Sequence, residues 1–225
     1  MWAVLVAAGR GERLGEDRPK AFAKLAGRPL LAESLERLDR SEWVDAIVVV
    51  AAPGWEEPSI LLAEESSAGK VSAAVTGGDS RSESVRLGLA EVPEETAVVI
   101  VHDAARPLLP EDLIDRVVSP LGPDWDGAVP ALPVADTLKR ADGERVAETV
   151  DRSGLYAVQT PQGFVASTLR DAMTRAGGGA TDCSSFVEAA GGRVRLVPGD
   201  HRLLKVTTGA DLELAETLLA QERAS

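Results

Sequence analysis

Residues 4–13 read Val4-Leu5-Val6-Ala7-Ala8-Gly9-Arg10-Gly11-Glu12-Arg13, and Arg18-Pro19-Lys20 follow. This stretch predicts an apolar strand that runs directly into a glycine-bearing loop. The two glycines allow a sharp turn and a close approach to a ligand, and successive backbone N–H groups in such a loop form an anion-binding nest. Arg13 and Lys20 add positive charge suited to phosphate. The stretch therefore favours a triphosphate-binding loop, with an ordinary strand-to-helix turn and solvated charges as the alternative.

Two common phosphate-binding motifs do not match this loop. The chain contains no G-x-x-x-x-G-K-[ST] string. The dinucleotide fingerprint G-x-G-x-x-G would need a third glycine where Arg13 stands, and an acid after the next strand. That strand, 47–50, is followed by Ala51-Ala52-Pro53-Gly54. A dinucleotide cofactor is therefore not expected.

The composition limits the classes of partner. The chain has 225 residues, 44% hydrophobic and 27% charged, with a net charge of −12, so a nucleic acid or an anionic membrane surface is not an expected partner. An anionic nucleotide would need a local basic pocket.

Cys183 is the only cysteine and His102 and His201 are the only histidines, so neither a disulfide nor a Cys/His metal cluster is expected. No apolar run approaches the ~20 residues of a membrane helix, and no basic segment precedes the first strand. We expect a cytoplasmic enzyme.

Strand-like and helix-like segments alternate along the chain. Apolar strand-like runs lie at 2–8, 45–52, 70–76, 96–102, 126–132, 154–160, 193–197 and 203–206. Helix-like runs lie at about 30–39, 56–66, 82–91, 110–118, 165–175, 182–190 and 209–222. This alternation predicts an α/β fold in which a mostly parallel, twisted sheet lies between two helix layers. We expect residues 1–225 to form a single domain.

Residues 133–153 interrupt the alternation. They are polar, and Asp142-Gly143 is flanked by short strand-like runs, which predicts a β-hairpin. A hairpin of this length buries too little apolar surface to be stable alone. We expect it to form a protruding arm, a subdomain that packs on a second subunit.

Four further polar blocks follow predicted strands or close the arm. They are Gly77-Gly78-Asp79-Ser80-Arg81-Ser82-Glu83-Ser84-Val85; Val101-His102-Asp103-Ala104-Ala105-Arg106-Pro107; Thr149-Val150-Asp151-Arg152 with Gln159-Thr160-Pro161-Gln162; and Thr181-Asp182 with Leu204-Lys205-Val206-Thr207. Since ligands of parallel sheets bind at the carboxyl ends of the strands, these blocks are candidates for one site.

Each block has a functional and a structural interpretation. The glycines and hydroxyls of 77–85 suit a base edge or a phosphate, or Ser80 or Ser82 simply caps a helix. Asp103 suits a ribose hydroxyl or Mg²⁺, or it caps a turn. Arg152 suits an acceptor phosphate, or it is a solvated charge of the arm. Lys205 stands in an apolar strand-like run, where a lysine needs a partner or a cleft.

Taken together, the blocks resemble one protein family. The loop A-A-G-x-G-x-R…P-K alone resembles nucleotidyltransferases that act on phosphorylated sugars and alditols. The full set, A-A-G-x-G-x-R, G-G-D-x-R-x-x-S-V, V-H-D-A-A-R-P, D-T-x-K-R, T-V-D-R, Q-T-P-Q and L-K-V-T, resembles 2-C-methyl-D-erythritol 4-phosphate cytidylyltransferases over residues 3–216. One departure is Cys183, which stands where that family usually has a glutamate in T-D-E-A-S.

The resemblance implies a Rossmann-like three-layer fold, a homodimer joined through the arm, and a cytidylyltransferase of the non-mevalonate pathway of isoprenoid biosynthesis. The reaction would transfer CMP from CTP to 2-C-methyl-D-erythritol 4-phosphate, with Mg²⁺ held mainly by the CTP phosphates. The implied catalytic residues are Arg13, Lys20, Arg152 and Lys205. The implied CTP-binding residues are Ala7, Ala8, Gly9, Gly11, Gly78, Asp79, Ser84 and Asp103, with Asp103 on either ribose or metal. The implied acceptor-binding residues are Arg106, Thr137, Arg152, Thr181 and Lys205, and the arm would supply Thr137 and Arg152 to the other subunit.

Two other functions stay open at this point. One is a nucleotidyltransferase with another phosphorylated acceptor, such as a sugar phosphate or molybdopterin. The other is a nucleotide-binding subunit without catalysis, against which the cations Arg13 and Lys20 argue.

Overall fold

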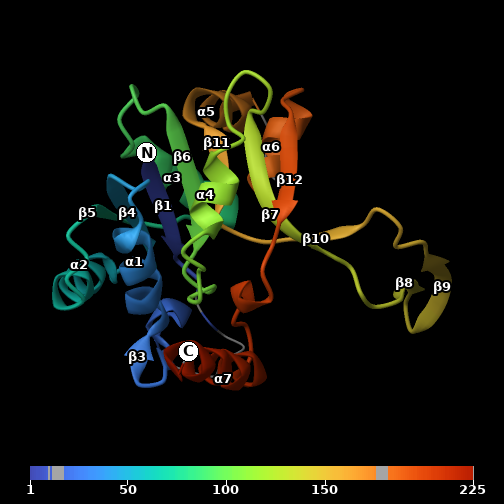
Figure 1. The fold of residues 1–225 in the computed structure, drawn as a ribbon, viewed down its shortest axis with the longest axis horizontal. Helices are drawn as coiled ribbons and strands as arrows, with labels where there is room; N and C mark the ends of the chain where they lie inside the picture. The colour runs from blue at the N-terminus through green and yellow to red at the C-terminus, as the bar shows by residue number, and fades with distance from the viewer. Residues whose placement is uncertain (10, 12–17, 176–181, 225) are drawn as a thin grey trace.

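A computed structural model describes residues 1–9, 11, 18–175 and 182–224, and its centre is an eight-stranded sheet (Figure 1). The strand order is β10-β7-β11-β6-β1-β4-β5, and β12 pairs with β7. The strands are β1 (Trp2–Ala7), β4 (Ala46–Ala51), β5 (Val71–Thr76), β6 (Val98–Asp103), β7 (Gly127–Pro133), β10 (Tyr156–Val158), β11 (Gln162–Val165) and β12 (Val194–Pro198).

The sheet is mixed but mostly parallel. Strand β1 lies parallel between β4 and β6, while β4 pairs in parallel with β5 and β7 with β12. Strand β11 is antiparallel to both β6 and β7, and β10 is antiparallel to β7. The parallel strands β5, β4, β1 and β6 therefore bring their carboxyl ends to one edge.

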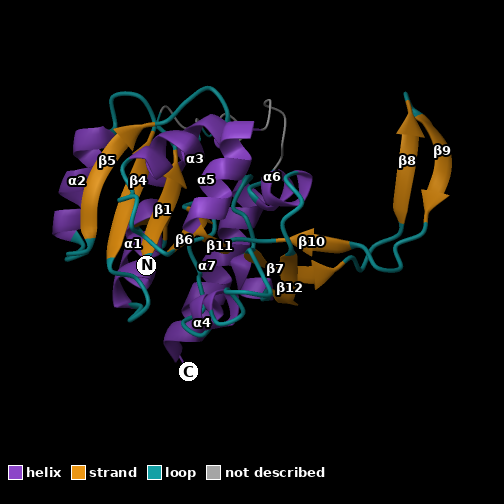
Figure 2. Ribbon diagram, turned by 90° about the horizontal axis from the view of Figure 1, so that it is seen from above, coloured by secondary structure: helices purple, strands orange, loops and turns teal. Residues whose placement is uncertain are grey.

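Helices cover both faces of the sheet, as Figure 2 shows. One apolar cluster joins Leu5 of β1 to α1 (Leu30–Arg40), α2 (Glu56–Glu65) and α4 (Leu113–Val118). Its counterpart joins Val4 to α3 (Arg81–Ala90), α5 (Ala166–Arg175) and α6 (Ser184–Ala189). Successive side chains of a strand point to opposite faces, so β1 contributes to both layers. The expected three-layer α/β arrangement is confirmed.

The C-terminal helix α7 (Gly209–Ala224) packs outside these layers, on residues near the first loop. It packs on β2 (Lys24–Leu25), which η2 (Lys20–Phe22) and β3 (Arg28–Pro29) flank in the chain, and η3 (His201–Leu203) precedes it. Arg37 links α1 to α7, since its guanidinium lies 2.7 Å from Glu222 and 3.0 Å from Glu33. The last turn of α7 is thereby held against α1.

The hairpin around Asp142-Gly143 forms as β8 (Leu138–Asp142) and β9 (Arg145–Val150). Gly143 has a φ of 59°, the left-handed conformation that this tight turn requires. Nearly all arm side chains are exposed, and the arm extends far from the sheet in Figures 1 and 2. Within the described part of the chain, β8 and β9 pair with each other and with no further strand.

Two of the predicted strands are wrong in detail. Residues 203–206 are not a strand, because η3 ends at Leu203 and the chain then meets the body by a backbone bond from Val206 N to Ala105 O (2.8 Å). The run 154–160 forms only β10, and β11 follows at 162–165, beyond Pro161. Among the described residues, no helix combines the length and apolar character that a membrane span needs.

Candidate active site

A cavity of about 510 Å³ lies at the carboxyl ends of β1 and β6, beside the start of α3. Ligands of parallel sheets bind at this edge. The lining residues come from the predicted blocks and from Lys20: Val6, Ala7, Ala8, Gly9, Lys20, Ala21, Gly78, Asp79, Ser80, Arg81, Ser84, Asp103, Ala104, Ala105 and Lys205.

The loop after β1 folds back so that Lys20 reaches this cavity. The Lys20 N–H donates to the carbonyl of Gly9 (3.1 Å). Gly11 has a φ of 74°, and a Cβ there would lie 2.9 Å from Lys20 Cβ, so only glycine fits without strain. Gly11 therefore shapes the loop without lining the cavity. Arg13 lies outside the described residues.

The Gly77–Ser84 loop both caps a helix and lines the cavity. Ser80 Oγ accepts a hydrogen bond from the N–H of Glu83 (3.1 Å), so the capping interpretation is correct for this residue. A Cβ on Gly77 would lie 2.3 Å from Ala8 Cβ, which shows how closely the two loops pack. The N–H of Gly78 donates to Ser84 Oγ (3.1 Å). These contacts place backbone of two different loops on one wall.

Asp103 is the electrostatic centre of the site. Arg81 Nε donates to its Oδ1 (2.9 Å) and Lys205 Nζ to its Oδ2 (2.6 Å). Burial opposes ionisation, but the charges of Arg81 and Lys205 outweigh it and hold the pKa of Asp103 well below its usual range. The residue is therefore a carboxylate at neutral pH, bonded at both oxygens.

His102 is linked to the backbone of Asp103 through Thr160. The N–H of Asp103 donates to Thr160 Oγ1 (3.1 Å), which in turn lies 3.1 Å from His102 Nδ1. His102 Nε2 lies 3.1 Å from the carbonyl of Arg106, which can only accept. Nε2 is thus assigned the hydrogen, and Nδ1 accepts from Thr160. Burial lowers the pKa of His102 to about 4, so the ring is neutral at pH 7.

Lys205 reaches the site from a segment fixed on both sides. Before it, η3 ends at Leu203, whose carbonyl accepts from Arg106 Nη1. After it, Asp211 accepts from the N–H (2.9 Å) and hydroxyl (2.6 Å) of Thr207. The half-exposed lysine needs a partner, as the sequence suggested, and that partner is Asp103.

A second cavity, of about 480 Å³, adjoins the first and shares Arg81, Asp103 and Lys205 with it. The residues that line only the second cavity are Arg106, Val158, Gln159, Thr160, Gln162, Asp182, Ser184, Ser185 and Glu188. A charged ridge of the three shared residues therefore separates two spaces, each large enough for a small ligand.

Cys183 lies behind this ridge. It is 1% exposed, and Arg81 Nη1 approaches its Sγ at 3.5 Å. Burial raises the pKa of the Cys183 thiol to about 11. At the position where the resemblance leads one to expect a glutamate, this chain therefore has a neutral, buried side chain.

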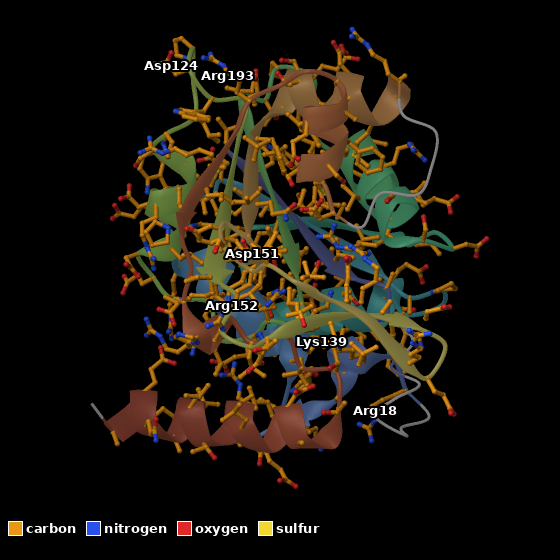
Figure 3. The ribbon with its side chains drawn as sticks, turned by 90° about the vertical axis from the view of Figure 1, so that its right-hand side faces the viewer. Arg18, Asp124, Lys139, Asp151, Arg152 and Arg193 are labelled. Carbon is orange, nitrogen blue, oxygen red and sulfur yellow. The ribbon has the colours of Figure 1, made fainter. Side chains whose placement is uncertain are left out.

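The structure brings most of the predicted site residues together. Those lining the first cavity are Ala7, Ala8, Gly9, Lys20, Gly78, Asp79, Ser84, Asp103 and Lys205, and Arg106 lines the second. Thr137 and Arg152 are exposed and line neither; Arg152 lies in a hollow at the base of the arm. Figure 3 shows Arg152 beside Asp151 on the side where the arm projects. Thr181 lies outside the described residues.

Arg81 is the site residue that the sequence interpretation missed. It is the first residue of α3, directly after the Gly77–Ser80 loop, and it lines both cavities. Its position at a helix start beside a strand-end loop was a usable signal. Its partner, Asp103, ends a different strand, so the pairing itself was not visible in the sequence.

Comparison with known proteins agrees with this arrangement. Residues 1–221 match the family described as "IspD: 2-C-methyl-D-erythritol 4-phosphate cytidylyltransferase". The chain belongs to this family. It is 46% identical to the family member of that name from Saccharopolyspora erythraea, covering 97% of this chain and 98% of the relative. It is 45% identical to the Nocardia farcinica member, covering 99% of this chain and 95% of the relative.

Solved structures of the family share the fold. The crystal structure of 2-C-methyl-D-erythritol 4-phosphate cytidylyltransferase from Thermus thermophilus superposes with a TM-score of 0.79 at 35% identity, covering 96% of this chain and 98% of that one. The cavity at the sheet edge thus belongs to a fold seen in the IspD family.

Proposed function

We propose that the protein transfers CMP from CTP to 2-C-methyl-D-erythritol 4-phosphate, giving 4-diphosphocytidyl-2-C-methyl-D-erythritol and pyrophosphate in the non-mevalonate pathway of isoprenoid biosynthesis. The proposal rests chiefly on the first cavity, where the Ala7–Gly9 backbone, Lys20 and Lys205 meet at one sheet edge. Family membership supports the choice of nucleotide and acceptor.

The reaction needs positioning and charge neutralisation more than proton transfer. The acceptor phosphate monoester is already largely dianionic at pH 7, because its second pKa is about 6. One of its oxygens attacks the α-phosphorus of CTP; that O–P bond forms while the bond to the β-phosphate oxygen breaks, and pyrophosphate leaves with the electron pair. Lys20 and Arg13 would neutralise the charge on the phosphates. His102, neutral and bonded on both ring nitrogens, has no part as a base.

The two adjoining cavities suit two substrates. We assign CTP to the first cavity, with Gly78, Asp79 and Ser84 next to the cytosine and ribose of the nucleotide. The acceptor would enter on the side of the second cavity, with its phosphate near Lys205, which borders both. Arg106 lines that second space.

Mg²⁺ fits this site only if the protein and the CTP phosphates hold the ion together. Among the described residues, no three His, Cys, Asp or Glu side chains form a metal-binding group. Asp103 is a carboxylate, the hard oxygen ligand that Mg²⁺ prefers, and triphosphate oxygens would supply most of the rest. When bound, the ion would neutralise charge on the phosphates. We therefore propose a divalent cation as cofactor, with Asp103 as its protein ligand candidate.

A turnover assay with CTP, the named acceptor and Mg²⁺ tests the function, and UTP is the matched comparison. A pocket wall built from backbone groups can distinguish the amino group of cytosine from the carbonyl of uracil, and each polar group left unpaired costs ~1–3 kcal/mol. We expect kcat/KM for CTP to exceed that for UTP about tenfold or more. Equal values, or a better substrate among sugar phosphates, would refute the assignment, and CTP binding without turnover would indicate a non-catalytic subunit.

We also propose that the protein is a homodimer joined by the arm. The arm hairpin does not pair with the central sheet, and Arg152 and Thr137 line neither cavity of their own subunit. Leu155, Tyr156 and Val158 near the base of the arm are 38%, 48% and 37% exposed, and proteins normally cover an exposed apolar strand edge of this kind. A second copy would cover this surface and receive Arg152 in its acceptor site.

Mixing two inactive variants tests this arrangement. Arg152→Ala removes the arm cation and Lys20→Ala removes the loop cation, so a mixed dimer has one site with both lesions and one with neither. We expect about a quarter of parental activity after random mixing, because half the dimers are mixed and each has one intact site. Arg140→Ala, on the same arm, is the control and should stay near parental, since Arg140 forms an exposed ion pair with Glu148.

The mixed dimer should be isolated through two different tags before it is assayed. An isolated mixed dimer without activity would show that Arg152 serves its own subunit or is a surface charge.

A cytoplasmic location also stays a prediction, which cell fractionation would test.

A further inference from the structure

Arg81 occupies a position that neither substrate explains. Its guanidinium is bonded on one side to Asp103 and on the other to Cys183, and its side chain is 23% exposed. It lies at the boundary of both cavities, yet its charge is directed at the protein. Burial lowers the pKa of Arg81, but the negative charge of Asp103 outweighs burial and raises that pKa, so Arg81 carries its charge permanently.

The two cations on Asp103 differ in how firmly they are held. Arg81 Nε donates to Oδ1 at 2.9 Å, and Nη2 lies 2.9 Å from the same oxygen as an ion-pair contact that is not a hydrogen bond. Lys205 contacts Oδ2 with a single ammonium and its side chain is 41% exposed. A guanidinium is a rigid planar donor, whereas an ammonium on a four-carbon stem is mobile. Arg81 therefore fixes the carboxylate, and Oδ2 is the oxygen that an incoming group can reach.

Cys183 strengthens the hold of Arg81 on Asp103. Its thiol is neutral at pH 7 and is buried against Arg81. A carboxylate at position 183 would compete with Asp103 for the same guanidinium. With a thiol there, the full charge of Arg81 acts on Asp103.

We propose that Arg81 is a positioning residue, which acts on the reaction only through Asp103 by holding its Oδ1 and presenting Oδ2 to the bound nucleotide. The inference rests on the proposed use of the first cavity for CTP. It assigns to Arg81 a role in orienting the site, in place of direct contact with the acceptor or a role in folding alone.

A double-mutant cycle tests this proposal. The variants are Arg81→Met, Asp103→Asn and the double variant, each measured for kcat/KM and, by calorimetry, for CTP affinity. Residues in contact are typically coupled in their effects, so we expect Arg81→Met to lower kcat/KM about 10- to 100-fold in the parental protein. In the Asp103→Asn background the same change should cost less than about threefold.

Three controls separate positioning from other effects. Arg86→Met removes the same charge from the same helix at an exposed position, where Arg86 donates to the carbonyl of Met173 (3.4 Å), and should leave kcat/KM unchanged. Arg81→Lys keeps the charge but has one donor atom, and should recover part of the loss. Cys183→Ser tests the thiol contact and should be nearly silent if Asp103 is the partner that matters.

Additive losses in the cycle would overturn the proposal, because Arg81 would then act independently of Asp103. Near-parental activity of Arg81→Met would overturn it too. If Arg81→Met does not fold, as thermal unfolding will reveal, Arg81→Lys and Arg81→Gln complete the same cycle. If the parental protein turns over no acceptor, the proposed function fails, and the calorimetric cycle with CTP still decides the role of Arg81.

Discussion

Acidification should destabilise this protein through His102 before its carboxylates are protonated. The ring is buried and neutral, with a pKa lowered from 6.5 to about 4 by burial. The unfolded chain binds a proton at its ordinary value of about 6.5, and the folded protein does not until about pH 4. Between these values the unfolded state holds more protons, so stability falls as pH falls.

The magnitude follows from these two values. Integrating the difference in bound protons from about pH 7.5 to about pH 5 gives a loss of about 2 kcal/mol in the free energy of unfolding. Urea unfolding at the two pH values measures it, in the parental protein and in His102→Asn, which cannot titrate. We expect the change with pH to be smaller by about 2 kcal/mol in His102→Asn. His201→Asn alters the other histidine, which is exposed, and is the matched control.

The comparison uses the change with pH, so a general destabilisation by the asparagine does not affect it. If His102→Asn and the parental protein lose the same free energy on acidification, His102 is not the buried neutral group that its contacts with Thr160 and Arg106 indicate.

Three other outcomes can be checked with single variants or reagents. Lys20→Ala should fold normally and lose ~10²–10³ in kcat at saturating CTP, as expected when one preorganised donor is removed; near-parental kcat would exclude Lys20 as the catalytic cation. Cys183, buried with a pKa of about 11, should resist a thiol reagent at about pH 8 and react fully in guanidinium; rapid native labelling would contradict its placement. Asp211→Ala should lower the free energy of unfolding by ~1 kcal/mol, because Asp211 and Thr208 form a reciprocal capping box at α7; Glu213→Ala, at an exposed position of α7, is the control.

Much of the fold was predictable because its signals are local. Strand β1, the turn after it and the alternation of strands and helices are each set by residues close together in the sequence. Parallel strands then bring their carboxyl ends to one edge of the sheet. This reasoning placed Gly78 and Asp103 at one cavity without any knowledge of contacts. The hairpin at Asp142-Gly143 followed from turn chemistry alone.

The misses arise where tertiary contacts override local pattern. Residues 203–206 have the composition of a strand, but Leu203 and Val206 are buried by packing on the body while their backbone joins no strand of the described sheets. Strand β11 was missed because it has only four residues and begins right after Pro161, and proline is a local signal of a turn or loop. Such outcomes depend on what lies beside a segment, which no window of sequence contains.

Charge placement explains how an acidic chain builds a site for anions. The chain carries a net charge of −12, yet Lys20, Arg81 and Lys205 line one cavity. Gathering cations without a ligand would be unfavourable, and Asp103 removes that penalty by bonding Arg81 and Lys205 from the centre. An arriving phosphate can then take the place of Asp103 as the ion-pair partner of one cation only, the more exposed and flexible Lys205. Because Lys205 is 41% exposed and Arg81 23%, we expect Lys205 to exchange its partner while Arg81 keeps Asp103 in place.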